Sequence, residues 1–259
     1  MTALLEVDGL SKSFRGLKAL SALSMRVDEN EIVGLVGPNG AGKTTAFNVM
    51  SGVLPPTAGE VKVRGRRING MPAHKVVELG LARTFQATNV FRDATVLENV
   101  RRGLLGGPGI KFFATLFNTP SYRAESAHMR EKAYAILERV GLLDAAHVQA
   151  GALAYGHQRL LGVAIALATE PRVLLLDEPA AGLNPAEAEM MGRMITRIHD
   201  EMKISILLVE HNMRMVMGIC KRLVVLKHGE MIAQGTPEEI RADPHVISAY
   251  LGSEDDDAA

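Results

Sequence analysis

Short apolar runs recur along the chain, and segments with helical periodicity lie between them. The runs contain few polar residues, which is typical of parallel strands buried on both faces. They comprise Glu31–Val36, Val173–Leu176, Ser205–Val209 and Leu223–Leu226. The periodicity predicts helices over Lys43–Met50, Pro72–Leu79 and most of Thr95–Gly141, with a loop at residues 103–122. Because strands and helices alternate, the pattern favours an α/β fold with a parallel sheet.

Alternating positions near the amino terminus predict half-buried strands. Leu23, Met25 and Val27 form one such pattern, and Val61 and Val63 another. Two helix starts are also marked, at Asn184–Glu187 and Thr236–Glu239. Each segment begins with a residue, Asn184 or Thr236, whose side chain can accept a hydrogen bond from a free backbone N–H. Proline follows it, and glutamate occupies the third helical position.

Composition narrows the class of protein. The 259 residues carry 29 basic and 29 acidic side chains, so the net charge is zero, and 47% of the residues are hydrophobic. A general nucleic-acid binder usually has a basic excess, and a disordered chain lacks this much hydrophobic material. The single cysteine, Cys220, excludes a scaffold of internal disulfides. Without a secretion signal or an apolar run of about 20 residues, we expect a soluble cytoplasmic protein.

One glycine-rich segment carries the strongest chemical signal. Residues 37–44 read GPNGAGKT, which fits G-x-x-x-x-G-K-[ST], and they lie between a buried strand and a helix. Such a loop turns its N–H groups toward phosphates, and the following helix adds its positive amino-terminal end. We expect Lys43 to reach the β- and γ-phosphates and the Thr44 hydroxyl to ligate Mg²⁺. The residues expected to contact the nucleotide here are Gly37, Pro38, Asn39, Gly40, Ala41, Gly42, Lys43, Thr44 and Thr45.

Polar residues follow two of the predicted strands. Asp177 and Glu178 come directly after an apolar run, and the carboxyl ends of parallel strands face the ligand crevice. Asp177 is a candidate Mg²⁺ ligand, and Glu178 is a candidate for polarising an attacking water. His211 is placed to contact a γ-phosphate, although a lone histidine at such a position is more often structural. Gln86 is a candidate for reaching Mg²⁺ or water.

Taken in order, these segments resemble the ABC-transporter ATPase family over essentially the whole chain. GPNGAGKT is similar to its Walker A loop, RVLLLDEP (172–179) to Walker B with the catalytic glutamate, and AAGLNP (180–185) to the D-loop. The resemblance implies that ATP is the nucleotide, that Gln86 is the Q-loop residue and that His211 is the switch histidine. It also implies that Phe14 stacks on adenine. The segment LAYGH occupies the place of the ATP-contacting signature, through Ala154, Tyr155, Gly156 and His157.

The same resemblance implies an organisation for the chain. The fold would be an α/β P-loop core, a mixed sheet with an antiparallel amino-terminal part, plus a helical subdomain. The ATP-binding domain would span residues 1–252, with the helical subdomain at about 90–168, and an acidic tail would follow at 253–259.

A narrower resemblance is to the ATP-binding subunits of bacterial branched-chain amino acid importers. It rests on RTFQ (83–86), LFNTPSYR (116–123), LAYGHQR (153–159), LLLDEPAAGLNP (174–185) and AYLG (249–252). Members of that family act as head-to-tail dimers that drive membrane subunits. The resemblance implies a second ATP-binding subunit, two transmembrane permease subunits and, indirectly, a solute-binding protein. It implies a peripheral place on the inner face of the cell membrane, and no nucleic-acid partner.

The signature segment departs from the family pattern. Ala154 stands where many members have a serine that donates to the γ-phosphate, and Tyr155 and His157 replace glycine and glutamine. Gly156 remains, and the helix start still offers backbone N–H groups. We therefore hypothesise an asymmetric pair, in which this weakened signature serves the partner's nucleotide and makes the partner's site the slower one.

Other functions stay open from the sequence. A soluble ABC ATPase of DNA repair or translation usually has two nucleotide domains or a long coiled coil, and this chain has one phosphate loop and no sustained heptads. A P-loop GTPase or kinase would leave the signature unexplained, and no N-K-x-D segment for guanine is found. A purely structural role is disfavoured by the intact Lys43, Asp177 and Glu178. Importers of amides or urea are not distinguished, because the ATPase subunit does not touch the solute.

Overall fold

The computed structural model describes residues 3–84, 90–105 and 120–251. Its strands are β1 (Ala3–Phe14), β2 (Leu17–Asp28), β3 (Ile32–Val36), β4 (Ala58–Val63), β5 (Arg66–Arg67), β6 (Leu81–Arg83), β7 (Val173–Asp177), β8 (Ser205–Val209), β9 (Arg222–Lys227) and β10 (Glu230–Gly235). Its helices are α1 (Lys43–Met50), α2 (Ala73–Glu78), α3 (Val96–Leu105), α4 (Pro120–Val140), α5 (Tyr155–Leu167), α6 (Pro185–Met202), α7 (Met213–Ile219), α8 (Pro237–Ala242) and α9 (Pro244–Leu251). Short 3-10 turns span Leu143–Ala145 and Ala150–Ala152.

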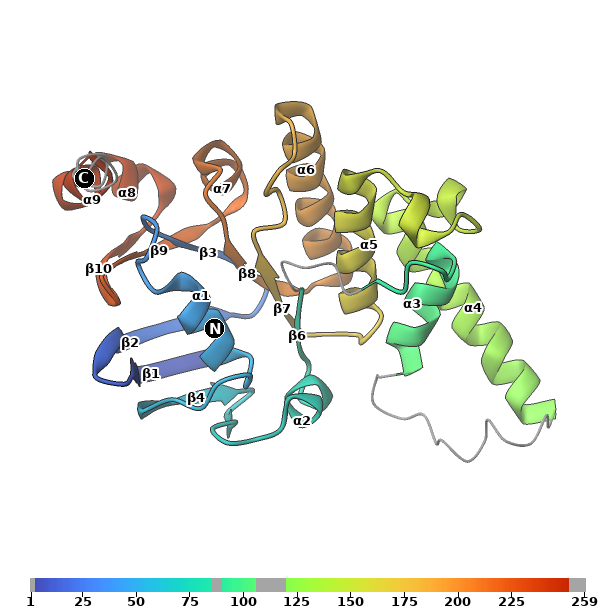
Figure 1. Cartoon of the computed structure of the whole chain (residues 1–259), viewed down its shortest axis with the longest axis horizontal. Coiled ribbons are helices and arrows are strands. Elements are labelled where there is room, and N and C mark those ends of the chain that lie inside the picture. The colour runs from blue at the N-terminus through green and yellow to red at the C-terminus, as the bar shows by residue number, and fades with distance from the viewer. Residues whose placement is uncertain (1–2, 85–89, 106–119, 252–259) are drawn as a thin grey trace.

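In the described part of the chain the strands form two sheets (Figure 1). The four-stranded sheet has the order β2-β1-β4-β5 and is antiparallel throughout. The six-stranded sheet has the order β10-β9-β3-β8-β7-β6, and its pairs are parallel except β9 with β10. The prediction of a mixed α/β fold with an antiparallel amino-terminal part is confirmed, and that part is a sheet of its own.

Both faces of the six-stranded sheet are covered, and its central strands are buried completely. Every residue of β3, β7 and β8 is buried. In β7, Leu174 and Leu176 face a core shared with α3 to α7, while Val173 and Leu175 face a second core shared with α1 and the antiparallel sheet. Burial on both faces explains why these strands read as apolar runs in the sequence.

The helices α3, α4 and α5 pack against one another beyond the β6 edge of the sheet (Figure 1). Val100, Leu137 and Leu161 lie fully buried in their common core. Gly103 allows α3 to approach α5 closely, since a Cβ there would lie 2.8 Å from the carbonyl oxygen of Ile165. Within the described ranges, every helix is too short or too polar to span a bilayer.

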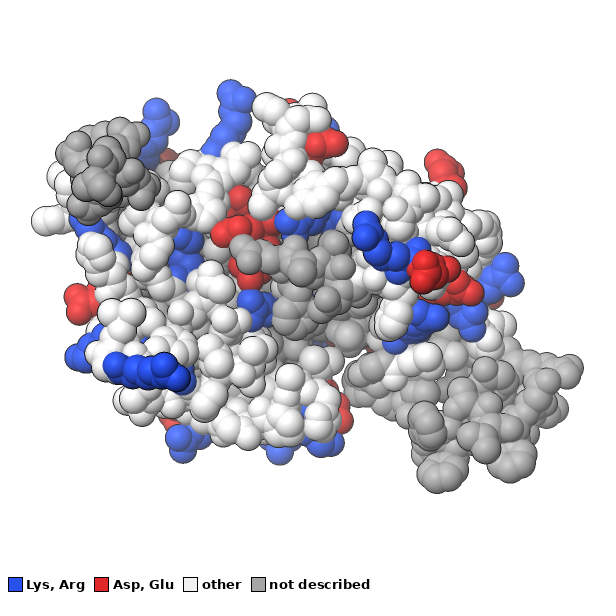
Figure 2. Space-filling view, in the orientation of Figure 1, with Lys and Arg blue, Asp and Glu red and all other residues white. Residues whose placement is uncertain are grey.

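Figure 2 shows charged side chains of both signs on the face that it draws, some of them side by side. This distribution agrees with a formal net charge of zero for the whole chain.

The strands and helices differ from the sequence predictions in a few places. The alternation near the amino terminus predicted β2 and β4, but β1, β5, β6 and β10 were not predicted. The helix α3 continues to Leu105 and α4 begins at Pro120, so both helices extend into the range predicted as a loop, and residues 106–119 lie outside the described part of the chain. The helix starts at Asn184 and Thr236 are confirmed, each with a complete capping box.

Candidate active site

The glycine-rich loop joins the carboxyl end of β3 to the start of α1. Gly42, the N-cap of α1, has a φ of 99°, which residues with side chains rarely adopt. A Cβ on Gly42 would lie 2.6 Å from the carbonyl oxygen of Ala19, so the approach of β2 also requires glycine. Gly229 lies beside Ala19 and also holds the loop, since its N–H donates to the Ala41 carbonyl at 3.0 Å. Because Gly42 has no side chain to cap them, the first N–H groups of α1 remain open to an anion.

The ammonium group of Lys43 lies within this loop. Its Nζ donates to the carbonyl oxygens of Gly37 at 2.7 Å and Pro38 at 2.8 Å, and the residue is only 6% exposed. Burial lowers the pKa of Lys43, and the negative charge of Glu178 offsets this in part. An ammonium group has three N–H donors, so Lys43 can donate to a phosphate oxygen while it keeps both loop carbonyls.

A cavity of about 460 Å³ opens beside the loop. Its walls come from the loop, the start of β2, the segments after β7 and β8, and the turn between β9 and β10. The structure thus brings the loop, Glu178 and His211 to one cavity. The residues that line it are Leu17, Lys18, Ala19, Asn39, Gly40, Ala41, Gly42, Lys43, Thr44, Thr45, Glu178, His211 and His228.

Glu178 and His211 form a hydrogen-bonded pair on the wall of this cavity. Nε2 of His211 lies 3.0 Å from Oε1 of Glu178. The Glu178 backbone has a φ of 48°, a left-handed conformation that disfavours residues with a Cβ, and its N–H donates to the carbonyl of Val209 at 2.9 Å. A carboxylate held in this way can orient a water molecule, and the imidazole can contact a phosphate oxygen.

Asp177 ends β7 and is only 2% exposed. Its Oδ2 accepts from Nη2 of Arg83 at 2.7 Å, while its Oδ1 has no hydrogen-bond partner in the part of the protein that the structure describes. Buried carboxylate oxygens normally have a partner, so Oδ1 fits a Mg²⁺ ion or a water bound to it. Thr44 supplies a hydroxyl in the cavity that Glu178 also lines, an oxygen of the kind that Mg²⁺ prefers.

The predicted signature residues Ala154, Tyr155, Gly156 and His157 do not line this cavity. Ala154 is the N-cap of α5 and makes no side-chain cap bond. Tyr155 is 49% exposed, and its ring lies against the segment after β7, since a Cβ on Gly182 would be 3.2 Å from Tyr155 Cε1. The start of α5 is therefore exposed at a place separate from this chain's own phosphate loop.

Phe14, expected to stack on adenine, does not line the cavity either. It ends β1 with 43% of its surface exposed, and the Nζ of Lys12 lies 5.1 Å from its ring centroid. Leu17, which is 73% exposed, stands at the cavity instead. Gln86 lies outside the described residues.

Arg83 and Glu210 belong to the site, although sequence reasoning did not single them out. Arg83 lies on β6 and also donates to Asn48 Oδ1 at 2.7 Å and Ser51 Oγ at 3.1 Å, so it connects α1 with Asp177. Glu210 is 3% exposed and accepts from the N–H of Ala180 at 2.6 Å. Only their positions in the sequence could have indicated that these two residues belong to the site, since each lies within three residues of a predicted site residue.

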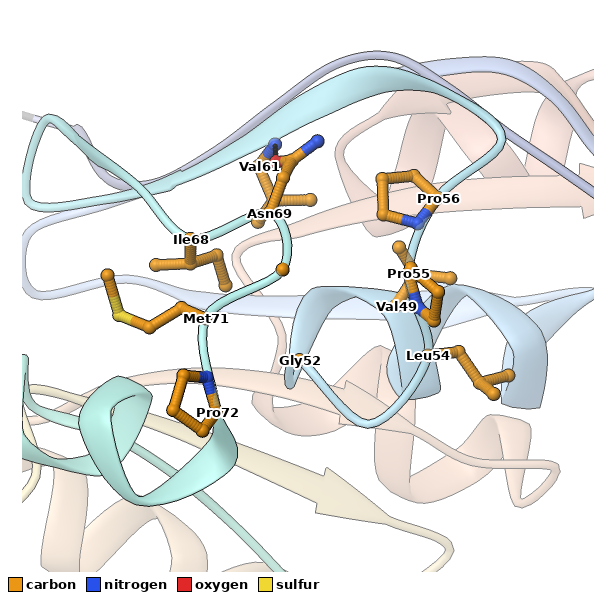
Figure 3. Close-up of a pocket in the computed structure, with 11 residues that line it drawn as sticks. Val49, Gly52, Leu54, Pro55, Pro56, Val61, Ile68, Asn69, Met71 and Pro72 are labelled. Carbon is orange, nitrogen blue, oxygen red and sulfur yellow. Dashed lines mark hydrogen bonds between the residues drawn. The ribbon is translucent and has the colours of Figure 1, made fainter.

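A second, apolar recess of about 290 Å³ lies between the end of α1 and the segment that leads into α2 (Figure 3). No titratable side chain lines it. The amide of Asn69 is already engaged, accepting from the Val61 N–H at 2.9 Å and donating to the Gly59 carbonyl at 3.0 Å. The recess thus lacks the donors that a charged nucleotide needs, in contrast to the cavity beside Lys43.

Comparison with known proteins gives matches over nearly the whole chain. The family model described as ABC transporter matches residues 20–181. The model described as branched-chain amino acid ATP-binding cassette transporter matches residues 230–256.

Two curated relatives and one solved structure are similar over most of their length. The chain is 43% identical to the high-affinity branched-chain amino acid transport ATP-binding protein BraF of Pseudomonas aeruginosa, covering 96% of this chain and 98% of that protein. It is 45% identical to the protein of the same description, LivG, of Salmonella typhimurium, with the same 96% and 98% coverage. Its fold is similar to the ADP conformation of MJ1267, an ATP-binding cassette of an ABC transporter, with a TM-score of 0.85 and 30% identity over 97% of this chain and 100% of that one.

Proposed function

Since this chain belongs to the ABC transporter family and is an ATPase, we propose that it powers the import of branched-chain amino acids through membrane subunits. The observation that best supports ATP hydrolysis is that the Lys43 loop and the Glu178–His211 pair line the same cavity. The solute is inferred from the names of the relatives and from the match at residues 230–256.

The loop binds the phosphates of ATP. Backbone N–H groups at the start of α1 and the ammonium of Lys43 face the negative charge, with the helix dipole acting in the same direction. Thr44 and the Oδ1 of Asp177, which has no partner among the described residues, would hold Mg²⁺, which when bound draws charge from the β- and γ-phosphate oxygens. Arg83 keeps the other oxygen of Asp177 engaged, so the carboxylate presents one oxygen to the metal.

Glu178 and His211 act on the bond that is cleaved. The carboxylate of Glu178 orients a water for attack on the γ-phosphate and accepts its proton. The imidazole of His211 contacts the γ-phosphate while its Nε2 stays within 3.0 Å of Glu178. Hydrolysis of this kind depends mainly on positioning and charge stabilisation, so the distance between the two side chains is a determinant of the rate.

Two ATP-binding chains close head to tail in this proposal. The start of α5 lies away from the chain's own cavity, which supports a role at the nucleotide of a partner. Because Ala154 has no hydroxyl, this chain would offer the partner's ATP a backbone N–H there in place of a serine hydroxyl. We infer an asymmetric pair, in which the partner's nucleotide turns over more slowly. Two permease subunits would receive the closing motion at the inner face of the membrane, and a solute-binding protein would deliver the amino acid to them.

Co-expression with the membrane-protein genes adjacent to its own tests this function. A tag on this chain should recover two permease subunits and a second ATP-binding chain. Vesicles that contain the complex should take up radiolabelled leucine only when ATP is inside, and the Lys43→Ala variant should abolish the uptake. Recovery without any membrane subunit, or ATP-driven uptake of urea or an amide in place of leucine, would contradict the proposal.

A further inference from the structure

Glu210 is a buried carboxylate whose hydrogen bonds join the two segments that carry the hydrolytic pair. It follows β8 directly and is 3% exposed. Its Oε1 accepts from the N–H of Ala180 at 2.6 Å. Its Oε2 accepts from the N–H groups of His211 at 3.0 Å and Asn212 at 3.2 Å. Both oxygens are therefore used, and each is used on a different segment.

The first of these segments begins at Glu178. Its left-handed backbone, with a φ of 48°, is disfavoured for a residue with a side chain and persists only where neighbouring contacts enforce it. Two such contacts flank it, because the Glu178 N–H donates to Val209 and the Ala180 N–H donates to Glu210. Glu210 thus supplies one of the two attachments that hold this turn against β8.

The second segment carries His211. Its backbone N–H and that of Asn212 both donate to the same carboxylate oxygen, and the Asn212 side chain then caps α7 by accepting from the Met215 N–H at 3.1 Å. The backbone on either side of the Glu178–His211 contact is therefore attached to one side chain. A shift of the turn at Ala180 would be transmitted through Glu210 to the backbone of His211.

We propose that Glu210 is a positioning residue for ATP hydrolysis, which sets the spacing between the Glu178 carboxylate and the His211 imidazole. This inference rests on the proposed function, since it assigns Glu210 a role at the same site. Gly182, in the segment that follows Ala180, also lies against Tyr155 at the start of α5, so the same carboxylate links the hydrolytic pair to the surface that would meet a partner chain.

The Glu210→Gln variant separates this role from simple packing. The side chain keeps its shape, but one oxygen becomes an NH₂ group, which cannot accept from an N–H. Either orientation of the amide releases one of the two segments. In the complex in which the chain co-purifies, we expect kcat for Mg²⁺-ATP to fall on the order of tenfold to a hundredfold, while the KM for ATP changes little because the Lys43 loop is untouched.

Glu31→Gln is the matched control. Glu31 is 7% exposed, accepts from the Asp28 N–H at 3.0 Å and pairs with Arg222 at 2.9 Å. It precedes β3, at the opposite end of the parallel strands from Glu210. Its substitution should lower stability but leave kcat unchanged. Equal losses of kcat in the two variants would overturn a specific role for Glu210.

A double variant gives the decisive comparison. If Glu210 acts through Glu178, then adding Glu210→Gln to Glu178→Gln should not reduce the residual hydrolysis further. A full additional loss in the double variant would overturn the proposal, as would a normal kcat for Glu210→Gln. If Glu210→Gln does not fold, Glu210→Asp keeps both oxygens at shorter reach, and a wild-type kcat for that variant would also refute the role.

Amide hydrogen exchange provides a readout that does not depend on hydrolysis. In the full chain without nucleotide, Glu210→Gln should accelerate exchange in peptides covering residues 179–183 or 211–213, and Glu31→Gln should not. Unchanged exchange in both peptides would refute the proposal that Glu210 holds the segments at Ala180 and His211 together. By contrast, absence of ATP hydrolysis in the wild-type complex would count against the proposed function, and the exchange result would still stand.

Discussion

The guanidinium of Arg83 lies 2.7 Å from Oδ2 of Asp177, and the two side chains are only 8% and 2% exposed. In the Arg83→Ala variant the carboxylate would be left buried without its cation. We expect the free energy of unfolding to fall by about 3–5 kcal/mol, measured by urea denaturation. Arg66→Ala, an exposed position on β5, should change it by no more than about 0.5 kcal/mol. A loss below about 1 kcal/mol for Arg83→Ala, the size of a surface ion pair, would contradict this account.

Lys43→Ala should weaken ATP binding without unfolding the protein. The variant loses a charge-assisted hydrogen bond to phosphate, which is worth about 1.5–3 kcal/mol, so the affinity should fall by roughly tenfold to a hundredfold. Isothermal titration calorimetry with ATP measures this. Lys18→Ala is the control, because Lys18 lines the same cavity but is exposed. Unchanged affinity in Lys43→Ala would refute the phosphate role of the lysine.

Glu178→Gln should keep ATP binding and slow hydrolysis by roughly 10²–10⁴-fold, the range of general acid–base catalysis. The amide retains the shape of the carboxylate and can still contact His211, but it no longer accepts the proton of the attacking water. Steady-state phosphate release and ATP affinity are measured on the same preparation. Normal turnover in this variant would show that another group activates the water.

Ala154→Ser should stabilise the start of α5 and speed up the nucleotide site that this helix faces. Ala154 is an N-cap without a side-chain hydrogen bond, and serine at an N-cap contributes about 1 kcal/mol. Asn184→Ala should have the opposite effect on stability, since it removes an existing cap on α6. If turnover in the assembled pair does not rise in Ala154→Ser, the weakened signature is not what makes one site slower.

Cys220 should resist alkylation in the folded protein. Burial raises the pKa of its thiol to about 12, and the residue is 6% exposed. At pH 8 the reactive thiolate would then be roughly one molecule in ten thousand. The folded pKa lies above the unfolded value, so unfolding restores ordinary reactivity. Iodoacetamide labelling at pH 8, with and without denaturant, follows this change; rapid labelling of the native chain would be inconsistent with the buried position.

The elements that sequence analysis predicted are those whose signal is local. The strands β3, β7 and β8 are apolar runs because both their faces are buried, and the cap at Asn184 depends on residues within one turn. The strand β1 was missed because Gly9, with a φ of 56°, and several register shifts break its alternation. The edge strand β10 was missed because none of its residues is buried, so no apolar pattern marks it.

The site residues also fall into two groups, those that local spacing predicts and those that it does not. The loop at residues 37–44 and the acidic residues at the end of β7 are each contiguous in the chain, so their spacing alone predicted them. Arg83 meets Asp177 only because β6 and β7 are neighbours in the sheet, and Glu210 reaches Ala180 only because β7 lies beside β8. Such partners depend on strand order, which residue types at a fixed spacing do not encode.

The phosphate loop lies against Ala19 and Gly229, which are neighbours in the structure although they come from opposite ends of the chain. The ribosome synthesises Ala19 long before Gly229, because synthesis proceeds from the amino terminus. Contacts between residues distant in sequence therefore form late. A nascent chain that has not yet emerged past Gly229 lacks one wall of its nucleotide cavity. Only chains that extend past Gly229 therefore have the complete cavity for ATP, and ligand binding becomes a late step in biogenesis that favours such chains over shorter ones.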